Sequence, residues 1–81
     1  MYKILDDKII YILNDNIIGE VCFEINGNKA LIYHTYVDSN YRGMGIASAL
    51  MKKAFEYLEK DYIVECSCSY AKTWAIKHGK L

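Results

Sequence analysis

The hydrophobic period of this chain changes from that of strands to that of a helix near Gly43, and it changes back near Ile63. Before Val37 the apolar residues are mostly Ile, Val, Tyr and Phe, which favour strands. After Gly43 they recur at helical spacing as far as Leu58, and a second β-type segment covers residues 63–68. A strand, a helix and a strand in this order form a right-handed crossover between parallel strands. The chain therefore predicts an α/β fold.

Three predicted strands come before the helix, at residues 8–13, 17–25 and 29–37. Asn14-Asp15-Asn16 separates the first two, and Asn26-Gly27 separates the second from the third. Both separators favour tight hairpin turns. We therefore expect three antiparallel strands, with the later β-type segment lying parallel to the third.

Alternation within the strands predicts which side chains face the core. In the second strand the odd-numbered residues of 17–25 form an apolar face, whereas Glu20 and Glu24 lie on a wetter one. In the third strand, His34 shares its face with Ala30, Ile32 and Tyr36. His34 is therefore expected to be either a hydrogen-bonded core residue or a functional side chain.

Two helices are expected. The first runs from Gly43 to Leu58, and its apolar stripe is formed by Ala47, Leu50, Met51, Ala54 and Leu58. The second is short, with Ser69 as its cap, Gly79 suited to its C′ position and a stripe of Ala71, Trp74, Ala75 and His78. The predicted order is βββαβα in one domain over residues 1–81: a small mixed sheet of three antiparallel strands and one parallel strand, with two helices.

The charge and cysteine content exclude several classes of protein. Ten basic side chains balance ten acidic ones, so bulk charge offers no attraction to nucleic acid or to an anionic membrane. The apolar runs are far shorter than the about 20 residues that span a bilayer, and no secretory leader is recognisable at the start. The cysteines, Cys22, Cys66 and Cys68, are odd in number, which indicates free thiols in a reducing cytoplasm. They lack the second ligand pair of a typical metal site, so no metal is expected.

One segment has the pattern of an anion-binding site. Residues 37–47 leave a strand, contain Gly43 and Gly45, and open a helix whose first amides lack intrahelical partners. Such an end binds phosphate because several N–H donors converge on it. Arg42 is the only arginine of the chain, and its planar guanidinium can hold phosphate oxygens bidentately. A bare Gly-x-Gly pattern also occurs in turns without a ligand, but the arginine and the strand-loop-helix context favour an anion site.

Arg42-Gly43-Met44-Gly45-Ile46-Ala47 resembles the Arg/Gln-x-x-Gly-x-Gly/Ala signature of the GNAT superfamily of acetyl-coenzyme A-dependent N-acetyltransferases. The resemblance implies that Arg42 and the amides of Gly43, Met44, Gly45, Ile46 and Ala47 hold the coenzyme A pyrophosphate. It also implies that the backbone near Tyr36 and Val37 pairs with the pantetheine arm of the cofactor.

The resemblance extends over roughly residues 8 to 79. The spacing of the family's C-terminal motif is found in Cys68-x-x-Ala71-x-x-x-Ala75-x-x-x-Gly79. The minimal, single-domain branch of the family has short motifs similar to His34-Thr35 and Cys68-Ser69-Tyr70. The implied fold is a truncated GNAT-like core. The two helices that usually follow the family's first strand, and the strands after its last helix, have no room here, although they commonly shape the acceptor pocket.

The resemblance also directs attention to the catalytic groups. Many enzymes of the family use a tyrosine on the last helix as general acid, and Ala75 stands at that position. Cys68 replaces an asparagine, and its thiol is a candidate general acid, a nucleophile that takes the acetyl group, or a small apolar wall. His34 is the candidate general base toward an amine. Glu20 and Glu24 are the next candidate bases, unless they are simply solvated acids.

The function implied by the resemblance is transfer of the acetyl group from acetyl-coenzyme A to a primary amine. The alternative is a coenzyme A-binding module without turnover. Two features support it: Ala75 stands in place of the tyrosine, and the elements that commonly shape the acceptor pocket have no room in this chain. The expected partners are a small-molecule acyl donor and an amine acceptor, with no nucleic acid or membrane. A cytoplasmic monomer or weak dimer is expected.

Overall fold

A computed structural model describes all residues of the chain, 1–81. The elements follow one another as β1 (Tyr2–Ile4), β2 (Lys8–Leu13), β3 (Asn16–Asn26), β4 (Lys29–Val37), the 3₁₀ turn η1 (Ser39–Tyr41), α1 (Ile46–Leu58), β5 (Ile63–Cys66) and α2 (Ser69–Lys77). None of the helices has the length and apolar character needed to cross a membrane.

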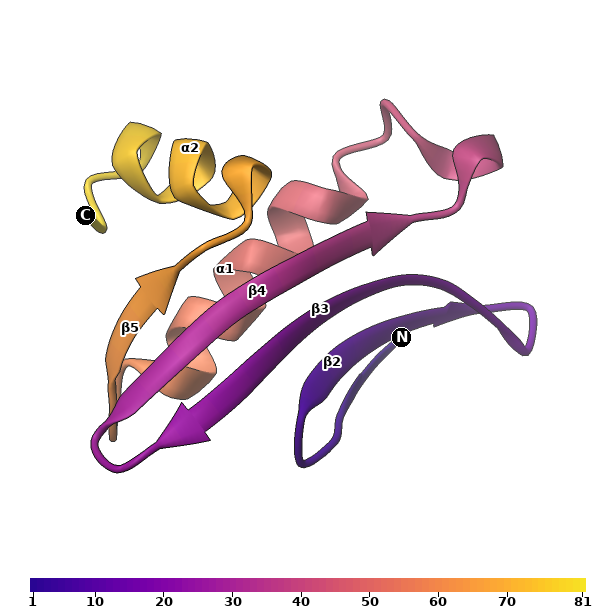
Figure 1. Cartoon of the computed structure of the whole chain (residues 1–81). Helices are drawn as coiled ribbons and strands as arrows, with labels where there is room; N and C mark the ends of the chain where they lie inside the picture. The colour runs from indigo at the N-terminus through magenta and orange to yellow at the C-terminus, as the bar shows by residue number, and fades with distance from the viewer.

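The strands form one mixed sheet in the order β1-β2-β3-β4-β5 (Figure 1). β1 to β4 are antiparallel neighbours, and β5 lies parallel to β4 as the crossover pattern predicts. The predicted four-stranded sheet is corrected to five strands, because residues 2–4 pair with β2 from Tyr2↔Tyr11 to Ile4↔Ile9. A strand of three residues is too short to show alternation in the sequence.

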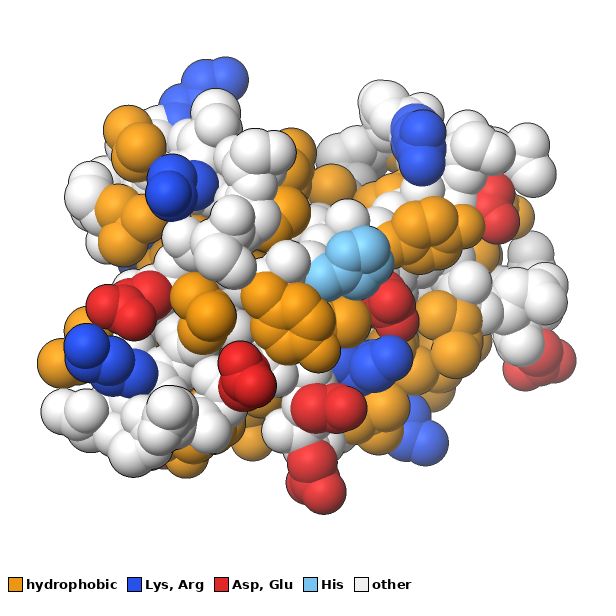
Figure 2. Space-filling view, in the orientation of Figure 1, with side chains coloured by type: hydrophobic (Ala, Val, Ile, Leu, Met, Phe, Trp, Pro, Cys, Tyr) orange, Lys and Arg blue, Asp and Glu red, His pale blue; other side chains and the backbone are white.

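Both helices pack into one core on one face of the sheet. The core joins strand residues such as Val21 and Ile32 to Leu50 and Met51 of α1 and to Trp74 of α2. In Figure 1, α1 passes behind β4, and no helix covers the near face. Figure 2 views this uncovered face, on which hydrophobic, acidic and basic side chains are mixed. The molecule therefore has two layers, one of sheet and one of helix.

A β-bulge in β3 changes the expected alternation. Tyr11 pairs with Gly19 and Ile12 pairs with Ile17, so Ile18 has no partner on β2. Ile18 is 2% exposed and Ile17 is 57% exposed, the reverse of the predicted apolar face. The extra residue inverts the orientation of the side chains on one side of it, as a bulge does.

A second bulge, in β4, corrects the placement of His34. Cys22 pairs with His34 and Phe23 pairs with Ile32, so Tyr33 is the extra residue. Ile32 is therefore fully buried against the helices, whereas the His34 side chain is 51% exposed on the uncovered face. The predicted shared face of His34 and Ile32 is wrong, because a regular alternation cannot anticipate the extra residue.

The helices bury most of the predicted apolar stripes, except that Ala47 is half-buried and His78 is exposed. α1 starts at Ile46 and not at Gly43, because Gly43 and Gly45 have positive φ. α1 buries Leu50, Met51, Ala54 and Leu58 as predicted, together with Phe55. α2 begins with Ser69 inside the helix and Cys68 as its N-cap, so Cys68 lies outside the strand in which it was predicted. Gly79 follows α2 with φ of 69°, the left-handed conformation expected at a C′ position.

Candidate functional site

The loop between β4 and α1 is built from short polar interactions. The Asp38 carboxylate accepts a hydrogen bond from the Asn40 amide at 2.9 Å. The backbone carbonyl of Asp38 accepts one from the Tyr41 amide, also at 2.9 Å. This arrangement forms η1 and turns the chain away from the sheet. Gly43 and Gly45 then take φ of 81° and 80°, conformations that suit glycine because no Cβ clashes with the backbone.

The start of α1 is open at the place where the sequence predicts an anion. Gly45 is the N-cap, and no side chain caps the helix. The amides of residues 43–48 donate to no backbone acceptor, because the first bond of the helix runs from the Ala49 amide to the Gly45 carbonyl. No atom lies within 4 Å of a Cβ placed on Gly43 or Gly45. This loop therefore presents a row of free N–H donors to an open space.

Arg42 is held beside this row. Its Nε donates to the Val37 carbonyl at 3.1 Å, which orients the guanidinium between the end of β4 and the loop. No protein acceptor takes the terminal Nη groups, and Arg42 is exposed. An oriented guanidinium with two free NH₂ groups has the geometry of an oxyanion ligand. Of the other predicted loop residues, Met44 is 68% exposed, and Ile46 and Ala47 are half-buried in the first turn of α1.

β4 and β5 separate before they reach Tyr36 and Val37. Their last paired residues are Ile32 and Cys66, and the Ser67 amide donates to the Ile32 carbonyl at 2.9 Å. Beyond that point the edge of β4 that faces β5 has no strand partner, whereas its other edge continues to pair with β3 as far as Val37. The backbone of Tyr36 and Val37 is thus placed at an opening in the sheet.

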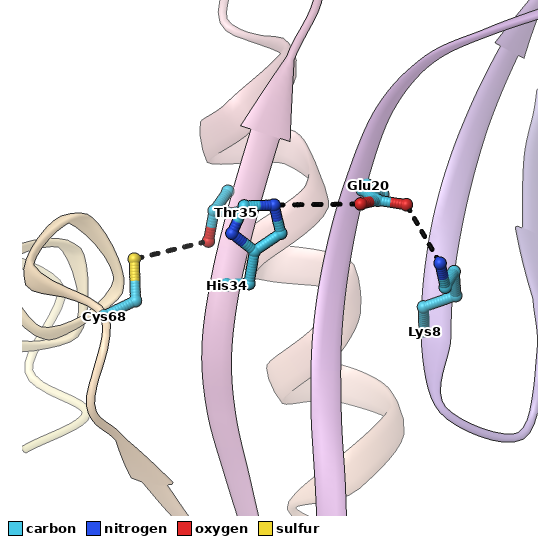
Figure 3. Close-up of polar contacts among 5 residues, drawn as sticks. All are labelled: Lys8, Glu20, His34, Thr35 and Cys68. Atoms are coloured by element: carbon cyan, nitrogen blue, oxygen red, sulfur yellow. Dashed lines mark hydrogen bonds and ion pairs between the residues drawn. The ribbon is translucent and has the colours of Figure 1, made fainter.

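Cys68 lies at this opening. Its Sγ is 4.0 Å from the Thr35 Oγ1, and the same hydroxyl lies 3.9 Å from the Met51 Sδ on α1 (Figure 3). The thiol is half-buried, and α2 starts at the next residue. Ala75, at the position of the family's tyrosine, is fully buried in α2. Cys68 therefore places a thiol beside the Thr35 hydroxyl at this opening.

His34 lies on the other face of β4. Its Nε2 is 3.7 Å from the Glu20 Oε2, and the Glu20 Oε1 accepts a hydrogen bond from the Lys8 Nζ at 3.1 Å (Figure 3). The hydrogen bond to Glu20 raises the pKa of Lys8, and the negative charge of Glu20 adds to the effect. His34 and Glu20 are thus brought together. Glu24 is exposed opposite Leu31, two residue pairs beyond the Cys22↔His34 pair.

The two predicted catalytic residues do not contact each other. Cys68 points at Thr35, whose side chain faces α1, whereas His34 points along the uncovered face toward β3 (Figure 3). The site thus has a thiol on one side of β4 and an imidazole on the other. Sequence reasoning assigned no role to Lys8 or Thr35, because their contacts join residues 12 and 33 positions apart and leave no local signal.

The other two cysteines are less accessible than Cys68. Cys22 and Cys66 are each buried, and burial is the main cause that raises the pKa of both thiols. For Cys22 the nearby Glu20 carboxylate adds to the increase in pKa. Thiols of this kind pack as small apolar groups and stay protonated at neutral pH.

Solved structures share this fold. A ribosomal-protein-alanine N-acetyltransferase from Brucella melitensis biovar Abortus 2308 is 18% identical, with a TM-score of 0.67 over 88% of this chain and 61% of its own. An N-acetyltransferase, PaiA, from Thermoplasma acidophilum, solved with coenzyme A, is 23% identical, with a TM-score of 0.60 over 65% and 33%. A candidate streptothricin acetyltransferase from Bacillus anthracis str. Ames, solved with acetyl coenzyme A, is 30% identical, with a TM-score of 0.58 over 65% and 31%.

The chain spans less than two thirds of the length of each of these proteins. A search of curated proteins by sequence found no match. The family model of GCN5-related N-acetyl-transferases matches residues 8–81, which include the loop, the opening beside β4 and Cys68. The chain therefore belongs to the GCN5-related N-acetyltransferase family.

Proposed function

We propose that this protein binds acetyl-coenzyme A and transfers the acetyl group to a primary amine. The observation that carries the proposal is the row of free amides at residues 43–48, beside an oriented Arg42, in a member of this acetyltransferase family. Two structures of similar fold that were solved with coenzyme A and with acetyl coenzyme A support this choice of ligand. The proposal treats residues 1–81 as one acetyl-coenzyme A-binding domain.

In this proposal the cofactor lies along the loop and the opening of the sheet. The pyrophosphate is held by Arg42 and by the backbone amides of the loop, because a guanidinium and converging N–H donors stabilise its negative charge. These amides belong to Gly43, Met44, Gly45, Ile46 and Ala47. The unpaired edge of β4 at Tyr36 and Val37 offers backbone groups to the amides of the pantetheine arm. The thioester then reaches the end of β5, near Cys68.

His34 is the proposed general base. An amine must lose a proton before its lone pair can attack the thioester carbonyl, and an imidazole is suited to take that proton near neutral pH. His34 faces the uncovered side of the sheet, where an acceptor can approach without displacing a helix. Glu20 contacts the Nε2 of His34, so it orients the ring, and Lys8 in turn orients Glu20.

Cys68 has two possible chemical roles in the transfer. In direct transfer, the amine nitrogen bonds to the acetyl carbon, the carbon–sulfur bond breaks, and the Cys68 thiol donates its proton to the leaving coenzyme A thiolate. In the two-step route, the Cys68 thiolate takes the acetyl group first and the amine then removes it. Both routes yield one amide and one coenzyme A, but only the second leaves an adduct of about 42 Da on the Cys68 peptide.

The alternative is a coenzyme A-binding module without turnover. Ala75 supports it, because this fully buried methyl group cannot act as the proton donor that many enzymes of the family have on the last helix. The two functions share the cofactor site and differ only in whether the thioester is consumed.

A titration followed by a thioester assay tests the proposal. Calorimetry is expected to detect the binding of both coenzyme A and acetyl-coenzyme A. Gly45→Glu is expected to abolish this binding, because it places a carboxylate against the pyrophosphate. Gly27→Glu is the matched control, since Gly27 also has a positive φ of 63° and open space around its Cβ but lies in the β3–β4 turn. Equal binding by the two variants would place the cofactor elsewhere.

Thioester loss in the presence of a panel of amines then separates the enzyme from the binding module. Loss that requires both the protein and an amine supports the transferase. Binding without any loss supports the module, and mass analysis of the Cys68 peptide distinguishes the one-step route from the two-step route.

A further inference from the structure

The Thr35 hydroxyl lies between two sulfur atoms that come from different helices or their ends. On one side, its Oγ1 is 4.0 Å from the Sγ of Cys68, the N-cap of α2 (Figure 3). On the other side, it is 3.9 Å from the Sδ of Met51 on α1. Met51 is fully buried, Thr35 and Cys68 are half-buried, and the three side chains thus form a row from the core to the opening beside β4.

The chemistry of the three groups fixes the direction of both hydrogen bonds. A thioether sulfur has lone pairs but no proton, so Met51 can only accept. The Thr35 hydroxyl has one proton and must donate it to make the contact with Met51. It can then only accept from the Cys68 thiol, which is a weak donor. A protonated Cys68 therefore satisfies both contacts in a single arrangement.

Loss of the Cys68 proton favours the opposite orientation of the Thr35 hydroxyl. A thiolate has no proton to give, and a hydroxyl that donates to its charge makes a hydrogen bond about twice as strong as a neutral one. Rotation of the Thr35 O–H bond supplies this donor. Met51 loses only a weak contact in exchange, because a neutral thioether is a poor acceptor.

The geometry points to Thr35 as a positioning residue that acts through Cys68, accepting from the thiol and donating to the thiolate, an inference that rests on the proposed function. In direct transfer, the Cys68 S–H bond breaks, its proton passes to the coenzyme A sulfur, and its electron pair stays on the Cys68 sulfur. Thr35 then turns its own proton from Met51 to this sulfur. In the two-step route, the Cys68 proton passes to solvent, and the same contact stabilises the thiolate that attacks the acetyl carbon.

The charged groups around Cys68 are separate from this row. Burial raises the pKa of Cys66 on β5, the charge of Cys68 adds to the increase, and Lys72 on α2 lowers it. His34 is the neighbour of Thr35 in β4, but it points to the other face of the sheet (Figure 3). The contact from α1 is an uncharged thioether. Neutral variants of the hydroxyl and of the thioether therefore leave the surrounding charges in place.

The pH dependence of Cys68 alkylation by iodoacetamide, followed by peptide mass spectrometry without a ligand, tests the inference. Thr35→Val keeps the branched shape but removes the donor to the thiolate. The pH midpoint of the rate is therefore expected to rise by about one unit or more, a change of about tenfold in the ionisation equilibrium. Thr35→Ser keeps the hydroxyl and is expected to restore the wild-type midpoint. Met51→Leu removes the competing acceptor at similar volume, so its midpoint is expected to fall.

Thr73→Val is the matched control, because Thr73 is the only other threonine and is exposed on α2. It is expected to keep the wild-type midpoint. Loosened packing would label the buried Cys22 and Cys66 and raise the maximal rate, without moving the midpoint of Cys68. The inference is overturned by an unchanged midpoint in Thr35→Val, by an equal shift in Thr73→Val, or by a shift that serine does not restore. A rise in Met51→Leu overturns it as well.

Steady-state kinetics extend the test to the transfer and separate the inference from the proposed function. Thr35→Val is expected to lower kcat by about tenfold or more with an unchanged KM for acetyl-coenzyme A. It is expected to add no further loss in a Cys68→Ala background, because it acts through that thiol. If wild type consumes the thioester but Thr35→Val keeps the wild-type midpoint and kcat, the inference is overturned and the proposed function stands. If the midpoints shift as expected but no amine consumes the thioester, the proposed transfer is overturned and the pairing of Thr35 with Cys68 stands.

Discussion

Cys22, Cys66 and Cys68 differ in the access that solvent has to their sulfur atoms. Cys22 and Cys66 are buried, and burial raises the pKa of both thiols. Cys68 is half-buried at the opening beside β4. Because the thiolate is the reactive form and must be reached by the reagent, the three thiols differ in the rate at which they react.

Limited alkylation is expected to modify Cys68 first. With iodoacetamide near neutral pH, the Cys68 peptide is expected to gain the label while Cys22 and Cys66 remain unmodified until denaturant is added. Coenzyme A is expected to slow the labelling of Cys68, because the proposed position of its thiol blocks the approach. Peptide mass spectrometry over a time course measures all three sites at once. Simultaneous labelling of Cys22 and Cys68 in the native protein would contradict the described burial.

His34→Gln tests the proposed general base. Glutamine keeps a polar side chain on the uncovered face but cannot accept a proton, so kcat is expected to fall by about 10²–10⁴-fold, the usual contribution of general base catalysis. The KM for acetyl-coenzyme A is expected to be unchanged, since His34 points toward Glu20 on the uncovered face, whereas residues 43–48 open the helix that packs on the other face. Glu24→Gln is the control on the same face, and steady-state kinetics at saturating amine provide the measurement. Unchanged kcat in His34→Gln would exclude the role.

At the scale of the elements, the sequence predicted what depends on local pattern. Three such features are confirmed: the apolar stripe of α1, the turn at Asn14 and Asp15, and the parallel pairing of β4 with β5. Asn14 and Asp15 both have positive φ. These features depend on residues close together in the chain, or on the fixed consequence of a strand-helix-strand order.

The bulges could not be predicted in the same way. Ile18 and Tyr33 are extra residues only in relation to the neighbouring strand, and a single strand's alternation contains no information about its partner's register. The error mattered for function, because the bulge at Tyr33 turns His34 to the uncovered face. The contact between Cys68 and Thr35 escaped prediction for the same reason, since it joins the start of α2 to β4.

Gly19→Ala is expected to destabilise the packing of α1 on β3. A Cβ on Gly19 would lie 3.0 Å from the Leu50 Cδ1, 3.2 Å from the Tyr36 carbonyl oxygen and 3.3 Å from the Ile46 Cγ2. Such overpacking is expected to lower the free energy of unfolding by about 1–3 kcal/mol, measured by urea denaturation.

A double-mutant cycle with Leu50→Ala checks the cause of that loss. Removing the Leu50 side chain makes room for the new methyl group, so the double variant is expected to be less destabilised than the sum of the two single variants. Simple additivity would show that contact with Leu50 is not the source of the effect.

The whole molecule is thin, because only one face of its sheet is covered. Its principal extents are 35 × 26 × 17 Å, and its core is a single cluster of 14 buried residues. Burial is the main cause that raises the pKa of four ionisable side chains, Tyr2, Cys22, Cys66 and Tyr70. The pKa of Lys8 is also raised, through its hydrogen bond to Glu20. All the shifts have the same sign.

The stability of the protein is therefore expected to fall as the pH rises above about 9, starting with the thiols. A raised pKa means that the folded state holds its proton over a range of pH in which the unfolded state has lost it. The free energy of unfolding then decreases with pH, starting near the unfolded thiol value of 9.0 and continuing past the values of 10.0 for tyrosine and 10.5 for Lys8. Urea midpoints measured under reducing conditions from pH 7 to pH 10.5 provide the test.

The Cys22→Ala/Cys66→Ala variant checks the contribution of the thiols. It is expected to be less stable at neutral pH, because it loses packing, but its free energy of unfolding is expected to fall less steeply with pH between about pH 8.5 and 10. A wild-type stability that stays level or increases across this range would contradict the burial of these groups, and an unchanged slope in the double variant would show that the thiols do not contribute to it.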